Sequence, residues 1–245
     1  MIINQRNPKV TGVLPVALER ACKLSEFFMR RDKTYVGIMK THKEIKLEIL
    51  QKIIDKEFIG KIKQLPPKRS KVKRQERVRE IKKFELLEKQ GKEVLFLADV
   101  EAGTYIRKLI HDLGLKIGGA HMAELRRTKA GIFSEEDKEW PIINLYEFDK
   151  AIDEFKKGKE EKLRKILIPA EQAIKKIMPI VQAKEDNLKQ LLIGKPLMKQ
   201  DLAEKEKLPE EEIFAVFYGE RFIEVARKSI EEDKEIIARP KFVLN

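Results

Sequence analysis

The chain has 245 residues, of which 53 are Lys or Arg and 41 are Asp or Glu, and it carries a formal net charge of +12. Its single cysteine, Cys22, excludes an internal disulfide framework and a cysteine-rich metal site. No apolar run approaches the roughly 20 residues of a membrane-spanning helix and the N-terminus lacks the pattern of a signal peptide, so we expect a soluble, cytoplasmic protein with no membrane partner.

The first predicted elements are a strand and a helix. The stretch "DKTYVGIMKTH", residues 32–42, is rich in β-forming residues and predicts a strand. The following residues 43–60 predict a helix that ends at Gly60. Its apolar residues recur at helical spacing: Ile45, Ile49 and Ile53, with Leu50 and Ile54 on the flank.

Positive charge is concentrated in the next stretch, Lys61 to Lys83, which holds eleven Lys or Arg residues and two Glu. A solvated face normally interleaves the two signs, whereas a single-sign segment around a Pro-Pro turn is typical of an arm that binds a polyanion. The alternative is the high lysine content of some thermophiles or AT-rich genomes, which would raise Lys and Glu together. We interpret the stretch as a nucleic-acid-binding segment.

Strands and a helix follow the basic stretch. Residues 79–103 contain two β-forming runs separated by Gln90 and Gly91, which predicts a hairpin. Residues 104–118 have the spacing of an amphipathic helix that ends near Gly114. The glycines of "GLKIGGAH" lack the spacing of a dinucleotide-binding or phosphate-binding loop, so they predict a turn.

Two further regions complete the chain. From Leu145 to Met178 the pattern is helical, with abundant Lys and Glu. A boundary is expected near Pro179, followed by a small β-rich tail with a hairpin around Gly219 and a last strand. We predict an α/β (α+β) fold in two domains, residues 1–178 and 179–245.

The residues indicate no metal or cofactor chemistry. The three histidines, His42, His111 and His121, show no metal-ligand spacing with cysteine or carboxylate residues. A Gly-x-Ser-x-Gly nucleophile motif is absent from the sequence. We therefore expect no metal and no cofactor, and the residues by themselves indicate a basic α/β protein that binds RNA or DNA.

Five blocks between the first residues and Phe133 resemble one family. In order, they are "NPKVTGVLPVALERA", "KTYVGIMKTH", "IKQLPPKRSKVKR", "VEAGTYIRKLIHDLG" and "GGAHMAELRRTKAGIF". They are similar to the TruB family of pseudouridine synthases, most of all to its dyskerin-type branch of archaea and eukaryotes. "LIPAEQAI", "LLIGKPL" and the terminal hairpin resemble the link into that branch's PUA domain, an RNA-binding β-barrel. The resemblance implies a mixed-sheet catalytic domain followed by a PUA-like domain.

The resemblance also implies an isomerase that converts uridine in RNA to pseudouridine by detaching the uracil, turning it and rejoining it through C5. The target base must leave its stack, so the protein has to stabilise an extruded nucleotide in a pocket. In the family's motifs, Tyr35 falls on the aromatic residue that stacks on this base and Arg107 on the arginine that pairs with the catalytic carboxylate. Leu125 falls near an apolar wall of the pocket. The plain alternative is that Tyr35 alternates on a strand and Leu125 belongs to the core.

The basic stretch matches the family's thumb loop, residues 61–76, which closes over bound RNA. The side chains expected to meet RNA are Lys68, Arg69, Lys71, Lys73, Arg74, Arg126 and Arg127. Phosphate contacts supply salt-sensitive affinity without sequence selection. In the dyskerin-type branch a guide RNA of the H/ACA class selects the target. The implied partners are therefore guide RNA, target ribosomal or transfer RNA, and small H/ACA core proteins.

One position departs from the family pattern. The family's catalytic aspartate precedes "PKVTG" in a segment resembling "GGTLDPKVTG", but here the position is Asn7 and the preceding residues "IINQR" do not match. An aspartate with a pKa of about 3.9 is an anion at neutral pH and can act as a nucleophile or general base. An asparagine amide does neither. We expect one event behind both departures: a lost, split or misassigned N-terminal segment.

Two hypotheses from different classes remain. The chain is an enzyme subunit that a separate chain completes by supplying the N-terminal segment, or it is a non-catalytic RNA-binding protein that retains the scaffold. The first predicts pseudouridine formation once the segment is supplied. The second predicts RNA binding without turnover.

Overall fold

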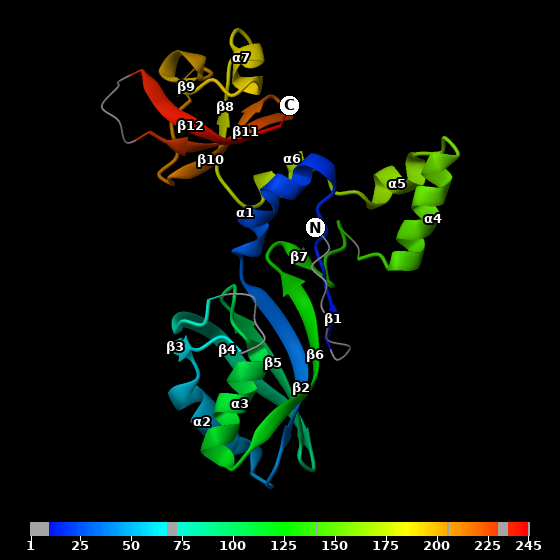
Figure 1. Cartoon of the computed structure of the whole chain (residues 1–245), viewed down its shortest axis with the longest axis vertical. Coiled ribbons are helices and arrows are strands. Elements are labelled where there is room, and N and C mark those ends of the chain that lie inside the picture. Colours follow the sequence, from blue (N-terminus) through cyan, green and yellow to red (C-terminus); the bar gives the residue numbers. More distant parts are fainter. Residues whose placement is uncertain (1–9, 68–72, 141, 205, 230–234, 245) are drawn as a thin grey trace. The chain divides into compact units, whose positions relative to one another are not determined.

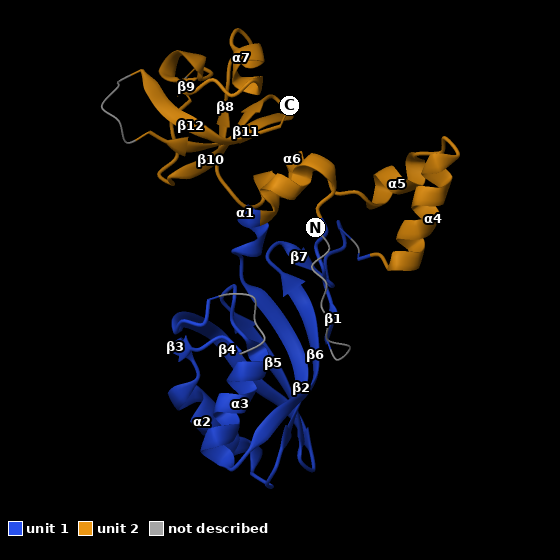
Figure 2. Ribbon diagram, in the orientation of Figure 1, with its two compact units in different colours: residues 1–16, 26–142 blue, residues 17–25, 143–245 orange. Residues whose placement is uncertain are grey.

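The computed structural model describes the chain except at residues 1–9, 68–72, 141, 205, 230–234 and 245. The chain divides into two compact units (Figure 2): unit 1 comprises residues 1–16 and 26–142, and unit 2 comprises residues 17–25 and 143–245. The domain start expected from sequence, residue 179, immediately precedes the first strand of the second sheet and lies within unit 2.

Unit 1 is built on one mixed sheet (Figure 1). Its elements are β1 (Val10–Gly12), α1 (Ser25–Met29, which begins at the unit boundary), β2 (Lys33–Thr41), α2 (Leu47–Glu57), β3 (Gly60–Gln64), β4 (Arg77–Gln90), β5 (Glu93–Val100), α3 (Ile106–Ile117), β6 (Ala120–Ala130) and β7 (Phe133–Ser134). The strand order is β1-β6-β2-β5-β4-β3, with β7 paired to β6. β1 runs parallel to β6, and the other pairs are antiparallel.

The hydrophobic core of unit 1 joins the sheet to α2 and α3. On α2 the fully buried residues are Leu50 and Ile54, whereas Ile49, expected on the apolar stripe, is 50% exposed. An α-helix turns by about 100° per residue, so Ile49 points to the side when Leu50 faces the sheet. Full burial of a Leu or Ile side chain contributes roughly 1.5–3 kcal/mol, which makes the ridge through Leu50 and Ile54 the one that holds α2 in place.

Helix α3 continues beyond the end predicted near Gly114 and stops at Ile117, where Gly118 follows in the left-handed conformation. Gly114 is buried inside the helix. A Cβ atom at this position would lie 2.4 Å from the backbone nitrogen of Ala120, the first residue of β6. The glycine therefore permits close packing of α3 against the following strand, and the stop signal comes from Gly118.

Unit 2 combines short helices with a five-stranded sheet of order β8-β10-β11-β12-β9. Its elements are η1 (Glu19–Leu24), α4 (Leu145–Lys156), α5 (Glu161–Ile166), α6 (Ala170–Lys175), β8 (Ile180–Gln182), α7 (Leu188–Leu192), β9 (Leu197–Met198), η2 (Lys199–Asp201), β10 (Ile213–Tyr218), β11 (Arg221–Lys228) and β12 (Ile236–Val243). The predicted mixed α/β class with a small β-rich C-terminal part is confirmed. In the described part of the chain, no helix has the length and apolar character needed to cross a membrane.

A glutamate is buried in unit 2. Glu224 on β11 is 0% exposed, and neither carboxylate oxygen has a hydrogen-bond partner among the described residues. Asp201, also 0% exposed, accepts hydrogen bonds from the Asn187 side-chain amide at 2.6 Å and the Met198 backbone N–H at 2.9 Å. Burial, and secondly the charge of Asp201, raise the pKa of Glu224 to about 8. Glu224 is therefore mostly protonated at neutral pH.

We predict that the chain loses stability as the pH rises from about 4.5 to about 8, because Glu224 ionises in this range when unfolded but not when folded. Because its pKa is about 8 when folded against an ordinary value of 4.5, the stabilisation is complete below pH 4.5 and is lost as the pH rises through 8. Glu224→Gln, which stays neutral, should remove this part of the pH dependence, on the order of a few kcal/mol. Urea denaturation between about pH 5 and pH 9, followed by circular dichroism, measures it.

Glu211→Gln is the matched control, because Glu211 is exposed in the same unit. It should leave the pH dependence of stability as in the unchanged chain. A Glu224→Gln variant whose stability depends on pH as steeply as that of the unchanged chain would contradict the prediction.

Candidate functional site

Tyr35 lies near the start of β2, which pairs with β5 on one side and β6 on the other. Its register partners are Ala98 on β5 and Arg127 on β6. The side chain is partly buried and packs against the hydrophobic core of unit 1. Because the strand is fixed from both sides, the ring offers a stacking surface in a defined place.

An apolar wall lies further along the same strand pair. Gly37 of β2 is opposite Phe96 on β5 and Leu125 on β6. A Cβ atom at Gly37 would lie 2.7 Å from the Phe96 Cζ and 3.0 Å from the Leu125 Cδ1, so both side chains reach over the glycine. Leu125 is 8% exposed and belongs to the core. The sheet thus brings Tyr35 and Leu125 to nearby positions, although they are far apart in sequence.

Arg127 lies directly opposite Tyr35 in the pairing of β6 with β2. Its Nε donates to the Val13 carbonyl oxygen at 2.7 Å. Burial raises the pKa of Tyr35, while the charge of Arg127 acts against that rise. Burial, and next the charge of Arg127, lower the pKa of Lys33. The sequence predicts an RNA contact for Arg127, whereas its side chain here bonds to groups within unit 1.

Strand β1 places the segment that follows position 7 against β6. Val10 pairs with Leu125, and Gly12 pairs with Arg127. Gly12 has φ of +102°, and a Cβ atom there would lie 2.2 Å from the Arg127 carbonyl oxygen, so the position requires glycine. Asn7 itself lies outside the described residues, and its predicted catalytic place stays a prediction.

Arg107 lies exposed in the first turn of α3. The start of this helix is held by Gln64, the buried last residue of β3. The Gln64 Oε1 accepts a hydrogen bond from the Tyr105 N–H at 3.0 Å, and its Nε2 donates to the Tyr105 carbonyl at 3.4 Å. The predicted pairing of Arg107 with a side chain at position 7 falls outside the described residues.

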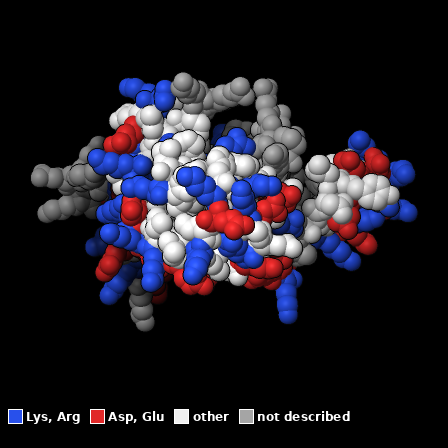
Figure 3. Space-filling model, turned by 90° about the horizontal axis from the view of Figure 1, so that it is seen from below, with Lys and Arg blue, Asp and Glu red and all other residues white. Residues whose placement is uncertain are grey.

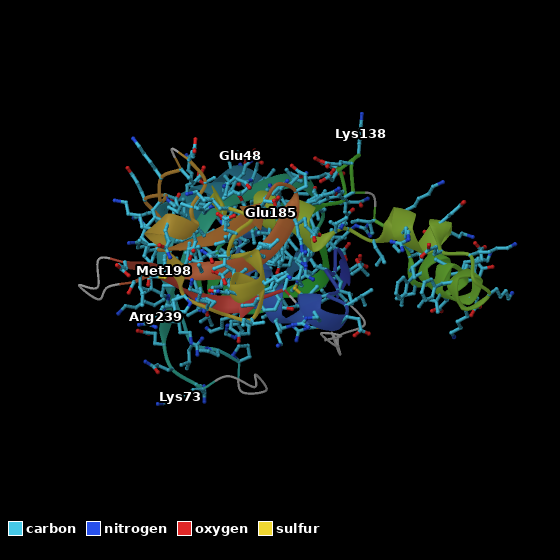
Figure 4. The ribbon with its side chains drawn as sticks, turned by 90° about the horizontal axis from the view of Figure 1, so that it is seen from above. Glu48, Lys73, Lys138, Glu185, Met198 and Arg239 are labelled. Carbon is cyan, nitrogen blue, oxygen red and sulfur yellow. The ribbon has the colours of Figure 1, made fainter. Side chains whose placement is uncertain are left out.

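Of the residues predicted to meet phosphates, Lys68, Arg69 and Lys71 lie outside the described residues. Lys73 and Arg74 are exposed, and Figure 4 shows Lys73 at the outer end of the connection between β3 and β4. Where the structure describes the chain, neither forms a salt bridge, whereas Lys63 of the same stretch pairs with Glu76 at 3.5 Å.

Arg126 differs from Lys73 and Arg74, because it is bound within unit 1. Its guanidinium donates to both carboxylate oxygens of Glu135 at 2.9–3.0 Å. Over the face drawn in Figure 3, positive and negative side chains are likewise interspersed. An arginine that already has a bidentate carboxylate partner has less to gain from a phosphate, so its predicted RNA contact stays a prediction.

Two histidines meet on neighbouring strand ends. The His42 Nε2 and the His121 Nδ1 are 3.2 Å apart, a proximity that sequence spacing did not indicate. Among the described residues, no three His, Cys, Asp or Glu side chains form a group that could hold a metal ion.

Family models match most of the chain. Residues 7–106 match the TruB family pseudouridylate synthase N-terminal domain, and residues 107–175 match the tRNA pseudouridylate synthase B C-terminal domain. The probable tRNA pseudouridine synthase B of Methanopyrus kandleri is 41% identical over 203 residues, 82% of this chain and 58% of that protein. Its namesake in Thermococcus onnurineus is 46% identical over 170 residues, 69% of this chain and 50% of that protein. The chain thus spans 50–58% of the length of these curated relatives.

Solved structures match both units. A crystal structure of a Cbf5–Nop10–Gar1 complex contains a chain with a TM-score of 0.82 and 35% identity, and the match covers 97% of this chain and 74% of that one. An H/ACA RNP bound to a substrate RNA containing 2′-deoxyuridine gives a TM-score of 0.81 at 32% identity, over 98% and 74% of the two chains. Together with the family models, these matches decide the family. The chain belongs to the TruB family of pseudouridine synthases.

Proposed function

We propose that this chain is the RNA-binding and base-stacking part of an H/ACA-type pseudouridine synthase, which isomerises uridine in transfer or ribosomal RNA. The observation that carries the proposal is the arrangement of Tyr35, which lies on the same strand pair as Leu125 and directly opposite Arg127. An extruded base needs a π-face and an apolar surround, and this arrangement offers both.

The comparisons support the substrate and partner classes. The names of the curated relatives support a transfer RNA target. The H/ACA particle among the structural neighbours supports recognition through a guide RNA, and the Cbf5 complexes with Nop10 and Gar1 support small core proteins as partners. We propose that the same classes of partner assemble on this chain.

In the proposed reaction the bond between C1′ and N1 of uridine breaks and a new bond joins C1′ to C5; C5 then loses its proton and N1 takes one up, so no atom is gained or lost overall. Tyr35 stacks on the base and handles a proton through its hydroxyl. Burial raises the pKa of this hydroxyl, so it is protonated at neutral pH and donates a hydrogen bond. Arg107, in the first turn of α3, pairs with the catalytic carboxylate where one is present, and Leu125 excludes water from one side of the base.

A second candidate function is RNA binding without turnover, and Asn7 favours it. The nucleophile of the family is an aspartate, and an asparagine amide carries no charge to attack C1′ or take a proton. Under this candidate the chain keeps the pocket and the phosphate contacts but forms no product.

We predict that the purified chain forms no pseudouridine on a uridine-containing RNA, even at high protein concentration, because Asn7 replaces the nucleophile. Asn7→Asp alone should restore little, since the resemblance implies that the nucleophile also needs its N-terminal supporting segment. Product is measured by pseudouridine-specific chemical labelling with mass spectrometry. Robust turnover by the unchanged chain would refute the prediction and would mean that another carboxylate serves.

Adding a polypeptide that supplies the family's N-terminal segment separates the two candidates. Product formation in that mixture supports the enzyme-subunit function, and Tyr35→Ala should then abolish it. RNA binding with no product in any mixture supports the binding function.

The thumb loop gives a prediction about RNA binding that does not depend on whether the chain is catalytically active. Replacing Lys68, Arg69, Lys71, Lys73 and Arg74 by Gln, with Pro66 and Pro67 kept, should lower affinity about evenly across unrelated RNA sequences. The slope of log K against log salt should shrink by about 0.7–0.9 for each phosphate that the variant no longer binds. Thermal stability should hardly change, because Lys73 and Arg74 are exposed, charged side chains are seldom fully buried, and surface substitutions usually stay within about ±0.5 kcal/mol. Binding measured at three or more salt concentrations checks this.

A matched control removes five exposed lysines elsewhere: Lys52, Lys156, Lys157, Lys159 and Lys165. The control makes the same change in net charge but leaves the thumb loop unchanged. If the thumb loop binds phosphates, the control should therefore lower the RNA affinity and the salt slope much less. If the two variants have equal effects, the thumb loop contributes only through the overall charge of the chain. If the salt slope of the thumb variant is unchanged, the thumb loop does not contact RNA phosphates.

A further inference from the structure

Arg127 joins two parts of the candidate site through one side chain. It lies directly opposite Tyr35 of β2 in the strand pairing, and its positive charge acts on the Tyr35 hydroxyl, whose pKa it lowers. Its Nε donates at 2.7 Å to the carbonyl of Val13, which directly follows β1. The side chain is part-buried at this contact, so the bond to Val13 is protected from competition with bulk water.

The backbone of Arg127 is fixed by the same neighbours. The Val13 N–H donates to the Arg127 carbonyl at 2.8 Å, so Val13 and Arg127 exchange two hydrogen bonds. Gly12 lies so close that a Cβ atom would be 2.7 Å from the Arg127 nitrogen and 2.2 Å from its carbonyl oxygen. Such packing leaves the Arg127 backbone no room to shift without moving β1.

A bulge in the β2–β6 pairing places Arg127 opposite Tyr35. Thr34 pairs with Lys129, but Tyr35 pairs with Arg127, so Thr128 is left out of register. The Thr128 hydroxyl donates instead to the Thr34 carbonyl at 3.3 Å. Successive side chains of a strand point to opposite faces, so one extra residue re-aims those that follow. Without the bulge, Thr128 would lie opposite Tyr35.

We propose that Arg127 is a positioning residue that fixes the Tyr35 hydroxyl and holds the β1 segment against β6 before RNA binds. The inference rests on the proposed function of Tyr35 as the stacking residue. A side chain that is already ordered in the free protein loses less entropy on binding, so its ligand binds more tightly. Arg126, the preceding residue, has no such role, because its guanidinium is held by Glu135.

Tyrosine labelled with ¹³C at Cζ tests the contact directly. The chain has four tyrosines, and Tyr35→Phe identifies the Tyr35 signal. Arg127→Met removes the charge and the donors but keeps an aliphatic stem. The pKa of Tyr35, read from the signal as the pH rises, should then increase, because the charge of Arg127 lowers it. Arg127→Lys retains the charge and should recover part of the difference.

Arg126→Met is the matched control, since it removes the same charge from the next residue on β6. It should leave the Tyr35 titration as in the unchanged chain. An unchanged titration in Arg127→Met, or an equal change in Arg126→Met, would overturn the proposal. If Arg127→Met does not fold, Arg127→Lys compared with Arg127→Gln gives the same contrast between a retained and a removed charge.

Uridine 5′-monophosphate then links the contact to binding. It should shift the Tyr35 signal of the unchanged chain, and Arg127→Met should weaken the apparent affinity about three- to tenfold, as expected when one more side chain must be ordered on binding. Equal affinity in both proteins would overturn the positioning role. If the nucleotide moves no Tyr35 signal even in the unchanged chain, the stacking function fails, while the titration without nucleotide still decides whether Arg127 fixes Tyr35.

Discussion

The pairing of β2 with strands on both of its sides is the constraint on which the candidate site depends. β2 is nine residues long and is bonded to β5 and β6 along its length. A strand held from both sides cannot slip by one residue without turning its buried side chains to the other face. Tyr35, Gly37 and the side chains opposite them are therefore placed by the sheet as a whole, and under the proposed function RNA would meet a surface that is already formed.

Local signals in the sequence predicted most of the elements, because strands and helices follow residue periodicity. The strand at 32–42, the hairpin at Gly91 and the β10–β11 hairpin at Gly219 were all predictable in this way. The errors arose where tertiary packing decides. Gly114 resembles a helix stop, yet it lies inside α3 because β6 begins against it. Ile49 and Leu50 are equivalent in hydrophobicity, and only the direction of the sheet tells which of them is buried.

The site residues fall into two groups: family motifs predict some of them, whereas the contacts of others depend on the register of the strand pairing. Tyr35 and Leu125 were predicted from family motifs, and the sheet brings them together. The contacts of Arg127 depend on a bulge at Thr34 and on a parallel pairing with β1, a strand more than a hundred residues away. Gln64 is a comparable case, since its bonds to Tyr105 join β3 to α3. Such long-range register cannot be read from one sequence, so the sequence predicts an RNA contact for Arg127 and no role for Gln64.

The charged groups around Tyr35 bear on two kinds of contact that the proposed function requires, with RNA phosphates and with the base. Burial and then repulsion by Arg127 lower the pKa of Lys33, whose ammonium donates to two neutral carbonyls, of Met29 and Arg31, at 2.6 Å each. Asp32, whose charge opposes this effect, is shared with Lys82 at 2.5 Å. An RNA phosphate entering this field would relieve the repulsion and raise the pKa of Lys33 again. Under the proposed function, phosphate attraction favours any RNA over a neutral nucleoside, and the ring of Tyr35 with its apolar neighbours would contact the extruded base.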